Sequence, residues 1–153
     1  MADVHPIPHD EYWRIFSKVP RLTVEIIVPG EKGVLLTLRD IEPCKGMWHL
    51  PGGSVQYGEL LKHAVKRIAK RKLGIEVTKM EFLGYIEYPS HFTKGLDSPV
   101  GMAFKIISYK GQVAPEAEAS AVDWFPEAPS NMHDEQTQFL AAHALIKAPQ
   151  PIN

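Results

Sequence analysis

The sequence predicts an α/β fold in which helices cover both faces of a mixed β-sheet. One observation is an amphipathic helix predicted near the middle of the chain, and another is a second amphipathic helix near its end. The third is that strand-like segments rich in β-branched residues lie both before and after the central helix. Because no linker or repeat divides the 153 residues, we expect a single domain spanning 1–153.

The first half of the chain should contain a short helix and three extended segments. Residues 9–19 place aromatic and aliphatic side chains at helical spacing and end before Pro20, so residues 1–20 are predicted to form an arm and a structural helix that packs by its aromatic face. The expected strands cover residues 22–28, 33–39 and 48–50. Because Gly30 to Gly33 is a turn signal, the first two strands should form a hairpin.

The second half alternates strands with loops and ends in a helix. Further strands are predicted at residues 75–88, 100–109 and 121–125. The polar segment 89–99 reads as a long loop, and such a loop often lies over a site. A helix over residues 133–147, capped by Ser130 or Asn131, should cover the face of the sheet opposite the central helix and precede a C-terminal tail at 148–153.

Composition and charge exclude several classes of protein. The formal net charge of −1 gives no general attraction to nucleic acids or to membrane surfaces. The single cysteine, Cys44, excludes an internal disulfide and is typical of a reducing compartment. Since no apolar run approaches the ~20 residues of a membrane span, we expect a soluble, cytoplasmic protein without nucleic-acid or membrane partners.

The central helix is predicted from Glu59 to Lys72. Its apolar residues recur at spacings of three and four and are Leu60, Leu61, Ala64, Val65, Ile68 and Ala69. The rest of its surface carries six cations: Lys62, Lys66, Arg67, Lys70, Arg71 and Lys72. These cations form either a solvated basic face that complements the helix dipole or part of an anion site.

The segment 53–75 carries a signature beyond this periodicity. Gly52 and Gly53 follow a strand and allow the backbone to turn sharply and to approach a ligand closely. Five residues fit the spacing Gly-x5-Glu-x7-Arg-Glu-(apolar)-x-Glu-Glu-x-Gly-(apolar), namely Gly53, Glu59, Arg67, Gly74 and Ile75. The chain therefore resembles the Nudix superfamily, which implies an α/β/α sandwich with a loop–helix–loop motif at 53–75.

Three glutamate positions of the Nudix motif are not matched. They hold Ile68, Arg71 and Lys72. In the family, helix glutamates hold Mg²⁺ or Mn²⁺ that polarises a diphosphate and activates water. Glu59 and Arg67 resemble the family's structural anion–cation pair, and Gly74 belongs to the same structural frame. The resemblance implies that any Mg²⁺ binds weakly here, mainly through the diphosphate of the substrate.

A closer resemblance lies outside this motif. The segment 19–53, followed by Val55 and Gln56, resembles the GDP-mannose mannosyl hydrolase branch, which cleaves a nucleotide sugar at the sugar carbon. By alignment with that branch, Glu25 and Arg39 fall where acidic and basic residues contact the ligand. A guanidinium suits a diphosphate because it is a rigid, permanently charged fork, and the alternative for Arg39 is a solvated side chain at a strand end. The resemblance also implies a homodimer.

The same comparison identifies residues that differ from the branch. The branch has a glutamate at the position of Lys72 and a glutamine–histidine pair where this chain has Glu118 and Ala119. Without that histidine, Glu118 is the expected catalytic base and the expected protein ligand of a metal. His91 and His133 are either acid–base residues or, in the favoured interpretation, surface or capping residues.

Two functions are consistent with these residues. The first is a Nudix-type hydrolase that acts slowly on a nucleoside diphosphate linked to another group, such as a sugar. The second is a protein that binds such a ligand without turnover, with Lys72 or Arg71 supplying the countercharge. In both, the expected ligand-binding residues are Glu25, Arg39, Gly52, Gly53 and Lys72.

Overall fold

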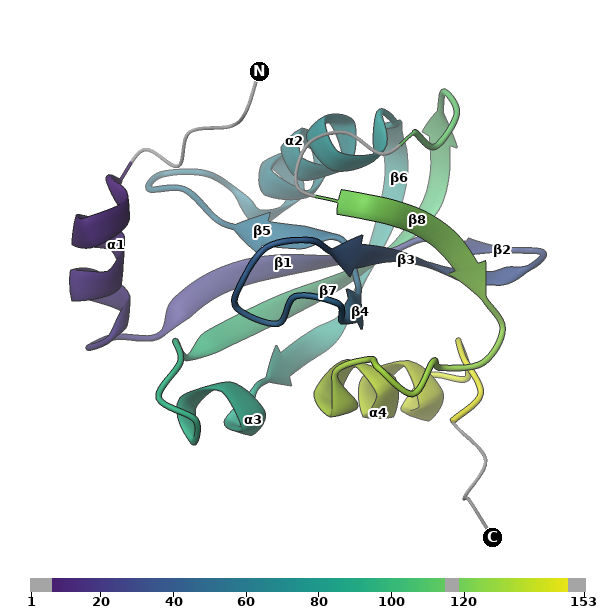
Figure 1. Ribbon diagram of the computed structural model, residues 1–153. Coiled ribbons are helices and arrows are strands. Elements are labelled where there is room, and N and C mark those ends of the chain that lie inside the picture. Colours follow the sequence, from purple (N-terminus) through teal and green to yellow (C-terminus); the bar gives the residue numbers. More distant parts are fainter. Residues whose placement is uncertain (1–6, 115–118, 149–153) are drawn as a thin grey trace, which may run out of the picture.

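The computed structural model describes residues 7–114 and 119–148, which form two sheets with helices around them (Figure 1). The strands are β1 (Arg21–Ile27), β2 (Pro29–Gly30), β3 (Gly33–Arg39), β4 (Trp48–His49), β5 (Gly52–Ser54), β6 (Glu76–Glu87), β7 (Pro99–Lys110) and β8 (Ala119–Phe125). The helices are α1 (His9–Phe16), α2 (Leu61–Leu73), α3 (Pro89–Phe92) and α4 (Asp134–Ala142). No helix in this part of the chain is long and apolar enough to cross a membrane.

The first sheet is mixed, which confirms the predicted class of fold. Its strand order is β5–β1–β7–β6. β1 runs parallel to β7, from Arg21 opposite Pro99 to Ile27 opposite Lys105, and antiparallel to β5. β6 and β7 also pair antiparallel. The residues of β1 from Thr23 onward are buried, as expected of a strand that is covered on both faces.

The second sheet shows that the predicted hairpin is wrong. β3 pairs antiparallel with β2, β4 and β8, so β1 and β3 belong to different sheets. The chain leaves the first sheet at Val28, whose carbonyl accepts a hydrogen bond from the backbone N–H of Leu35 at 3.1 Å. The next two residues, Pro29 and Gly30, form the short strand β2 that pairs with β3. The glycine turn is therefore where it was predicted, but the main partners of β1 come from elsewhere in the chain.

Two hydrophobic clusters hold the layers together. One packs α2 against the sheets and includes Val65, Ile68 and Leu73. The other includes Leu36 from β3 and Leu140 from α4. Figure 1 shows α2 and α4 on opposite sides of the sheets, so the C-terminal helix lies opposite the central helix, as predicted.

Several helix boundaries differ from the prediction. α2 begins after the predicted start, and Leu60, which was assigned to the apolar stripe, is 65% exposed. α4 ends at Ala142, and the residue at its N-cap is His133 rather than Ser130 or Asn131. The side-chain amide of Asn131 instead donates to the carbonyl of Gly46 at 2.8 Å and holds the loop before β4.

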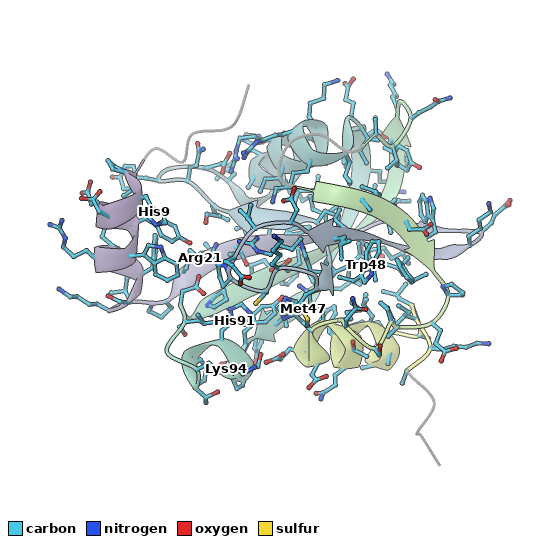
Figure 2. The ribbon with its side chains drawn as sticks, in the orientation of Figure 1. His9, Arg21, Met47, Trp48, His91 and Lys94 are labelled. Carbon is cyan, nitrogen blue, oxygen red and sulfur yellow. The ribbon has the colours of Figure 1, made fainter. Side chains whose placement is uncertain are left out.

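The N-terminal helix is not part of the core. α1 stands beside the sheets, away from α2 and α4 (Figure 1), and none of its side chains is fully buried. Its aromatic residues Tyr12 and Trp13 contact each other edge to face, with ring centroids 5.7 Å apart, and both line a cavity. Figure 2 shows Arg21, near α1, and His91, on α3, in the same region. The predicted structural helix therefore forms one wall of a pocket.

Candidate functional site

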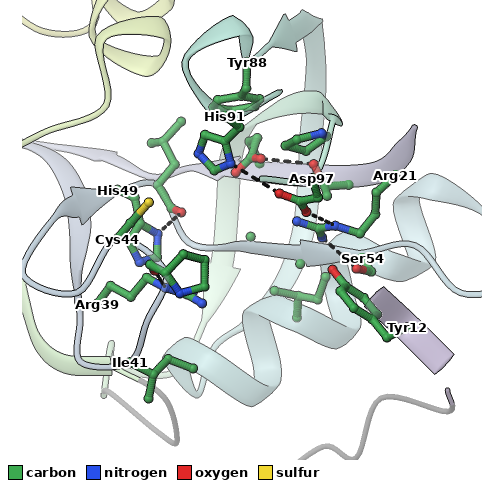
Figure 3. Close-up of a pocket in the computed structure, with 18 of the residues that line it drawn as sticks. Tyr12, Arg21, Arg39, Ile41, Cys44, His49, Ser54, Tyr88, His91 and Asp97 are labelled. Atoms are coloured by element: carbon green, nitrogen blue, oxygen red, sulfur yellow. Dashed lines mark hydrogen bonds and ion pairs between the residues drawn. The ribbon is translucent and has the colours of Figure 1, made fainter. Parts of the chain in front are cut away.

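A pocket of about 560 Å³ lies between α1, β5, α2 and the loop that follows β3 (Figure 3). Residues next to α3 and at the start of α4 complete its wall. The predicted ligand-binding residues that line it are Glu25, Arg39, Gly52, Gly53 and Lys72. Folding thus brings together residues that lie in four separate segments of the sequence.

One face of α2 presents cations to this pocket. Arg67, Arg71 and Lys72 line it, together with Arg39 from the end of β3. The remaining cations of the helix are exposed and are absent from the pocket wall: Lys62, Lys66 and Lys70. Three of the six cations of the helix therefore form a solvated basic face, and the other three face the pocket, as an anion site would require.

Lys72 stands at a glutamate position of the Nudix motif, and its ammonium contacts the backbone of β5. Its Nζ donates a hydrogen bond to the carbonyl oxygen of Gly52, and carbonyl oxygens are among the ligands of hard divalent ions. α2 contains no aspartate or glutamate, and Ile68, at one glutamate position of the motif, is only 1% exposed. The helix therefore does not offer the oxygen ligands that a Mg²⁺ site requires.

Gly52 and Gly53 are strand residues rather than a break in the chain. Gly52 pairs with Glu25, and a Cβ atom on it would lie 2.5 Å from both the carbonyl oxygen of Val24 and Oε2 of Glu25. A Cβ atom on Gly53 would lie 3.0 Å from Cδ1 of Ile68. Gly52 is needed because the backbone of β1 lies so close to it, whereas a side chain at Gly53 would require Ile68 to shift by a few tenths of an ångström.

Glu59 and Arg67 connect the loop after β5 to α2. Arg67 donates to the Glu59 carboxylate from Nε at 2.7 Å and from a terminal nitrogen at 3.0 Å. The same guanidinium donates to the carbonyl of Ser54 at 2.9 Å. Glu59 also accepts from the backbone N–H of Gln56 at 3.1 Å, and the Arg67 hydrogen bond lowers the pKa of Glu59. Gly74, with φ of 71°, ends the helix in the left-handed conformation.

The sequence comparisons agree with this arrangement. The family model of the NUDIX domain matches residues 19–142. The chain belongs to the Nudix family. It is 32% identical over 140 residues to the low-salt glycan biosynthesis protein Agl8 of Haloferax volcanii, a match that covers 89% of this chain and 90% of that protein.

Solved structures show the same fold. The MutT Nudix hydrolase from Burkholderia pseudomallei superposes with a TM-score of 0.74 at 23% identity, covering 81% of this chain and 98% of that one. The Nudix domain of Shewanella oneidensis NrtR, solved with ADP-ribose, superposes with a TM-score of 0.65 at 24% identity and covers 93% of each chain.

In this Nudix pocket, Glu25 is a buried acid. It is 8% exposed, its Oε1 accepts from the Thr23 hydroxyl at 3.1 Å, and it is also hydrogen-bonded to Tyr88. Burial raises the pKa of Glu25 to about 7, although the hydrogen bonds from Thr23 and Tyr88 act in the opposite direction. Glu25 is therefore a carboxyl group that exchanges a proton near neutral pH, a property that the sequence analysis did not assign to it.

Asp97 is a second acid of the pocket, and its pKa shifts in the opposite direction from that of Glu25. Its Oδ2 lies 2.8 Å from Nε of Arg21, and its Oδ1 lies 3.4 Å from Nδ1 of His91. Arg21 also donates to the Ser54 hydroxyl at 2.8 Å, which extends this chain of contacts across the pocket (Figure 3). Burial acts to raise the pKa of Asp97, but the hydrogen bond with His91 and the charge of Arg21 outweigh it and lower the pKa to about 2.

Two histidines that were not expected at this site lie in it, although His133 does hold the capping position at the start of α4. His91 and His133, interpreted as surface or capping residues, are half-buried in the pocket wall, with ring centroids 5.3 Å apart. The sequence signal for His91 was its position in the segment 89–99, which was expected to lie over a site. Glu118, the predicted base and metal ligand, lies outside the residues that the structure describes.

The pH dependence of stability should change when Glu25 is replaced by Gln. The pKa of Glu25 rises from the ordinary 4.5 to about 7, so the folded chain binds this proton more tightly than the unfolded chain. The free energy of unfolding therefore falls as the pH rises from 4.5 to 7, by about 3 kcal/mol at ~1.4 kcal/mol per pKa unit. Urea unfolding of wild type and Glu25→Gln at several pH values measures the difference.

Comparing wild type with Glu25→Gln also removes the contribution of His49, which changes stability with pH in the opposite direction. Burial lowers the pKa of His49 to about 4, so deprotonation of this residue increases stability as the pH rises from 4 to 6.5. His49 is present in both proteins and its effect cancels in the difference. Parallel stability profiles of wild type and Glu25→Gln would contradict the assignment.

Proposed function

We propose that this Nudix protein acts on a nucleoside diphosphate linked to another group, with a nucleotide sugar such as GDP-mannose as the expected ligand. The observation that carries the proposal is that Arg39, Arg71 and Lys72 line one pocket. These cations match the negative charge of a diphosphate, and guanidinium groups bind phosphate oxygens through paired hydrogen bonds. Support also comes from the similarity to a protein named for glycan biosynthesis and to a Nudix domain solved with ADP-ribose.

The proposed reaction is slow hydrolysis at the sugar carbon. Water attacks the anomeric carbon, the bond between that carbon and the phosphate oxygen breaks, and the nucleoside diphosphate leaves with the bonding electrons. A carboxylate accepts the proton of the attacking water. The cations around the diphosphate stabilise the charge that develops on the leaving group. Turnover is slow because an ammonium group does not lower the pKa of a water molecule as a divalent ion does.

Glu118 is the proposed base for this reaction and the proposed protein ligand of any Mg²⁺. Glu25 is the alternative to Glu118 as the base, since it lines the pocket and has a pKa of about 7. Mg²⁺ is proposed to bind weakly and mainly with the diphosphate, because α2 presents cations instead of carboxylates.

The assembly of the protein is proposed from the resemblance to the mannosyl hydrolase branch, and its location from the composition of the chain. We propose a cytoplasmic homodimer, which fits the prevalence of symmetric dimers among soluble proteins. Sedimentation analysis that finds only monomer at tens of micromolar protein would contradict the dimer.

The second candidate function is binding of the same class of ligand without turnover. One contact favours it, the hydrogen bond from Lys72 to the Gly52 carbonyl, which puts a fixed ammonium beside the β5 backbone. A fixed positive charge neutralises phosphate but activates no water. Release of free sugar from GDP-mannose separates the two functions.

Replacing Arg39 with Ala should weaken the binding of GDP-mannose by about 1.5–3 kcal/mol, the range for a hydrogen bond to a charged group. Isothermal titration calorimetry with GDP-mannose and ADP-ribose measures the change. Lys66→Ala is the matched control, because it removes a cation from the exposed side of α2. Equal affinities for wild type and Arg39→Ala would place the ligand outside this pocket.

Replacing Glu118 with Gln should abolish hydrolysis while ligand affinity is retained, because the amide does not accept a proton from water. Formation of mannose and nucleoside diphosphate from GDP-mannose, followed by NMR, measures the loss. Glu116→Gln, in the same segment, is the control and should retain activity. Rapid Mg²⁺-dependent hydrolysis by Glu118→Gln would show that another group is the base.

Wild-type protein should have no tight Mg²⁺ site on α2, and Lys72→Glu should create or strengthen one. The ammonium of Lys72 repels an ion bound near it by several kcal/mol at ~4 Å and an effective dielectric constant of ~20. Calorimetric titration with Mg²⁺ in the absence of nucleotide measures both proteins. Lys70→Glu makes the same charge change at an exposed position and should leave Mg²⁺ binding unchanged. Micromolar Mg²⁺ affinity of the wild type would refute this prediction.

A further inference from the structure

We propose that Cys44, His91 and His133 form a binding site for a transition-metal ion, of which Zn²⁺ is the expected physiological example. One ligand atom from each of the three residues lies within 4.8 Å of the other two. The residues come from three segments: the loop after β3, helix α3 and the position before α4. All three are half-buried and line the pocket. The site is distinct from α2, where the Nudix motif would hold Mg²⁺.

The ligand types determine which metal fits. A thiolate and two imidazoles are soft or intermediate donors, which favour Zn²⁺ and Co²⁺ over Mg²⁺. Three protein ligands beside a cavity are typical of a zinc site with an open fourth position. Donor atoms around tetrahedral Zn²⁺ lie about 3.3–3.6 Å apart, given bonds of ~2.3 Å to sulfur and ~2.0–2.1 Å to nitrogen. The three ligand atoms therefore need to approach one another by about 1.5 Å at most.

His91 is oriented for metal binding by its neighbours. Its Nδ1 lies 3.4 Å from Oδ1 of Asp97, and the same carboxylate is held by Arg21 at 2.8 Å. Nε2 of His91 is buried and has no hydrogen-bond partner within residues 7–114 and 119–148. Metal-binding histidines commonly donate their second N–H to a carboxylate in this way. A metal ion at Nε2 would satisfy a buried nitrogen that is otherwise costly to leave unpaired.

The charges around the cluster are balanced enough to accept a divalent ion. Arg39 and Lys94 are cationic neighbours of Cys44, whereas Glu42 and Asp97 are anionic neighbours. Metal binding replaces the thiol proton of Cys44, so the thiolate and Asp97 together offset the charge of the ion. A nucleophilic role for the thiol is less well supported, because no hydrogen bond joins Cys44 to either imidazole in the described part of the chain.

Cobalt substitution tests the site directly in untagged, reduced, metal-free protein. Titration with Co²⁺ should produce the visible d–d bands of a tetrahedral ion and a near-ultraviolet thiolate-to-cobalt band that saturate at one ion per chain. Zn²⁺ should displace the Co²⁺ and remove both signals. Cys44→Ser should lose the thiolate band, and His91→Ala and His133→Ala should each weaken Zn²⁺ binding by about tenfold or more.

The control for these variants is His63→Ala, which removes an exposed histidine of α2 outside the pocket and should leave the spectrum unchanged. Circular dichroism establishes that each variant is folded before its affinity is measured. The proposal is overturned if wild-type protein shows no thiolate-to-cobalt band, or if Cys44→Ser binds Zn²⁺ as tightly as wild type. This inference goes beyond the proposed function and does not rest on it, because every signal reports metal binding and none reports hydrolysis.

Discussion

The close approach of α2 to β5 is the constraint on which the pocket depends. Gly53 permits it, since any side chain there would meet Cδ1 of Ile68, and Ile68 is buried in the cluster that packs the helix on the sheets. Once Ile68 faces the sheets, the period of the helix directs Arg67, Arg71 and Lys72 toward the pocket. The packing of one apolar residue therefore fixes the position of the cations that determine the charge of the site.

The frame of the Nudix motif and its chemistry are separable in this molecule. The frame consists of glycines at close contacts, a bidentate ion pair between Glu59 and Arg67, and a helix end at Gly74, all of which position backbone. None of these contacts needs a metal ion. The charge of the side chains that face the pocket can therefore change from negative to positive while the loop–helix–loop keeps its shape, which is why membership of the family does not by itself establish the reaction.

The surroundings of two acids give them different protonation states within one pocket. Asp97 has a charged partner in Arg21 and a hydrogen bond with His91, which keep it ionised. Glu25 is also buried, but its hydrogen-bond partners are hydroxyl groups, so burial dominates and its pKa approaches neutrality. The pocket thus combines a fixed anion, a titrating carboxyl group and several cations, an arrangement suited to a polar, negatively charged ligand.

The sequence alone determined the α/β class, the central helix and its buried face, the pairing of Glu59 with Arg67, and the residues Glu25, Arg39 and Lys72 that meet in the pocket. The fold class and the helix follow from periodicity, which is local, whereas the ion pair and the pocket residues follow from the resemblance to the Nudix superfamily and its mannosyl hydrolase branch. Only the tertiary structure decided that β1 and β3 join different sheets, because strand partners are chosen by burial between distant segments. It also brought Cys44, His91 and His133 together, since each is an isolated residue in the sequence and they meet only when three distant segments converge.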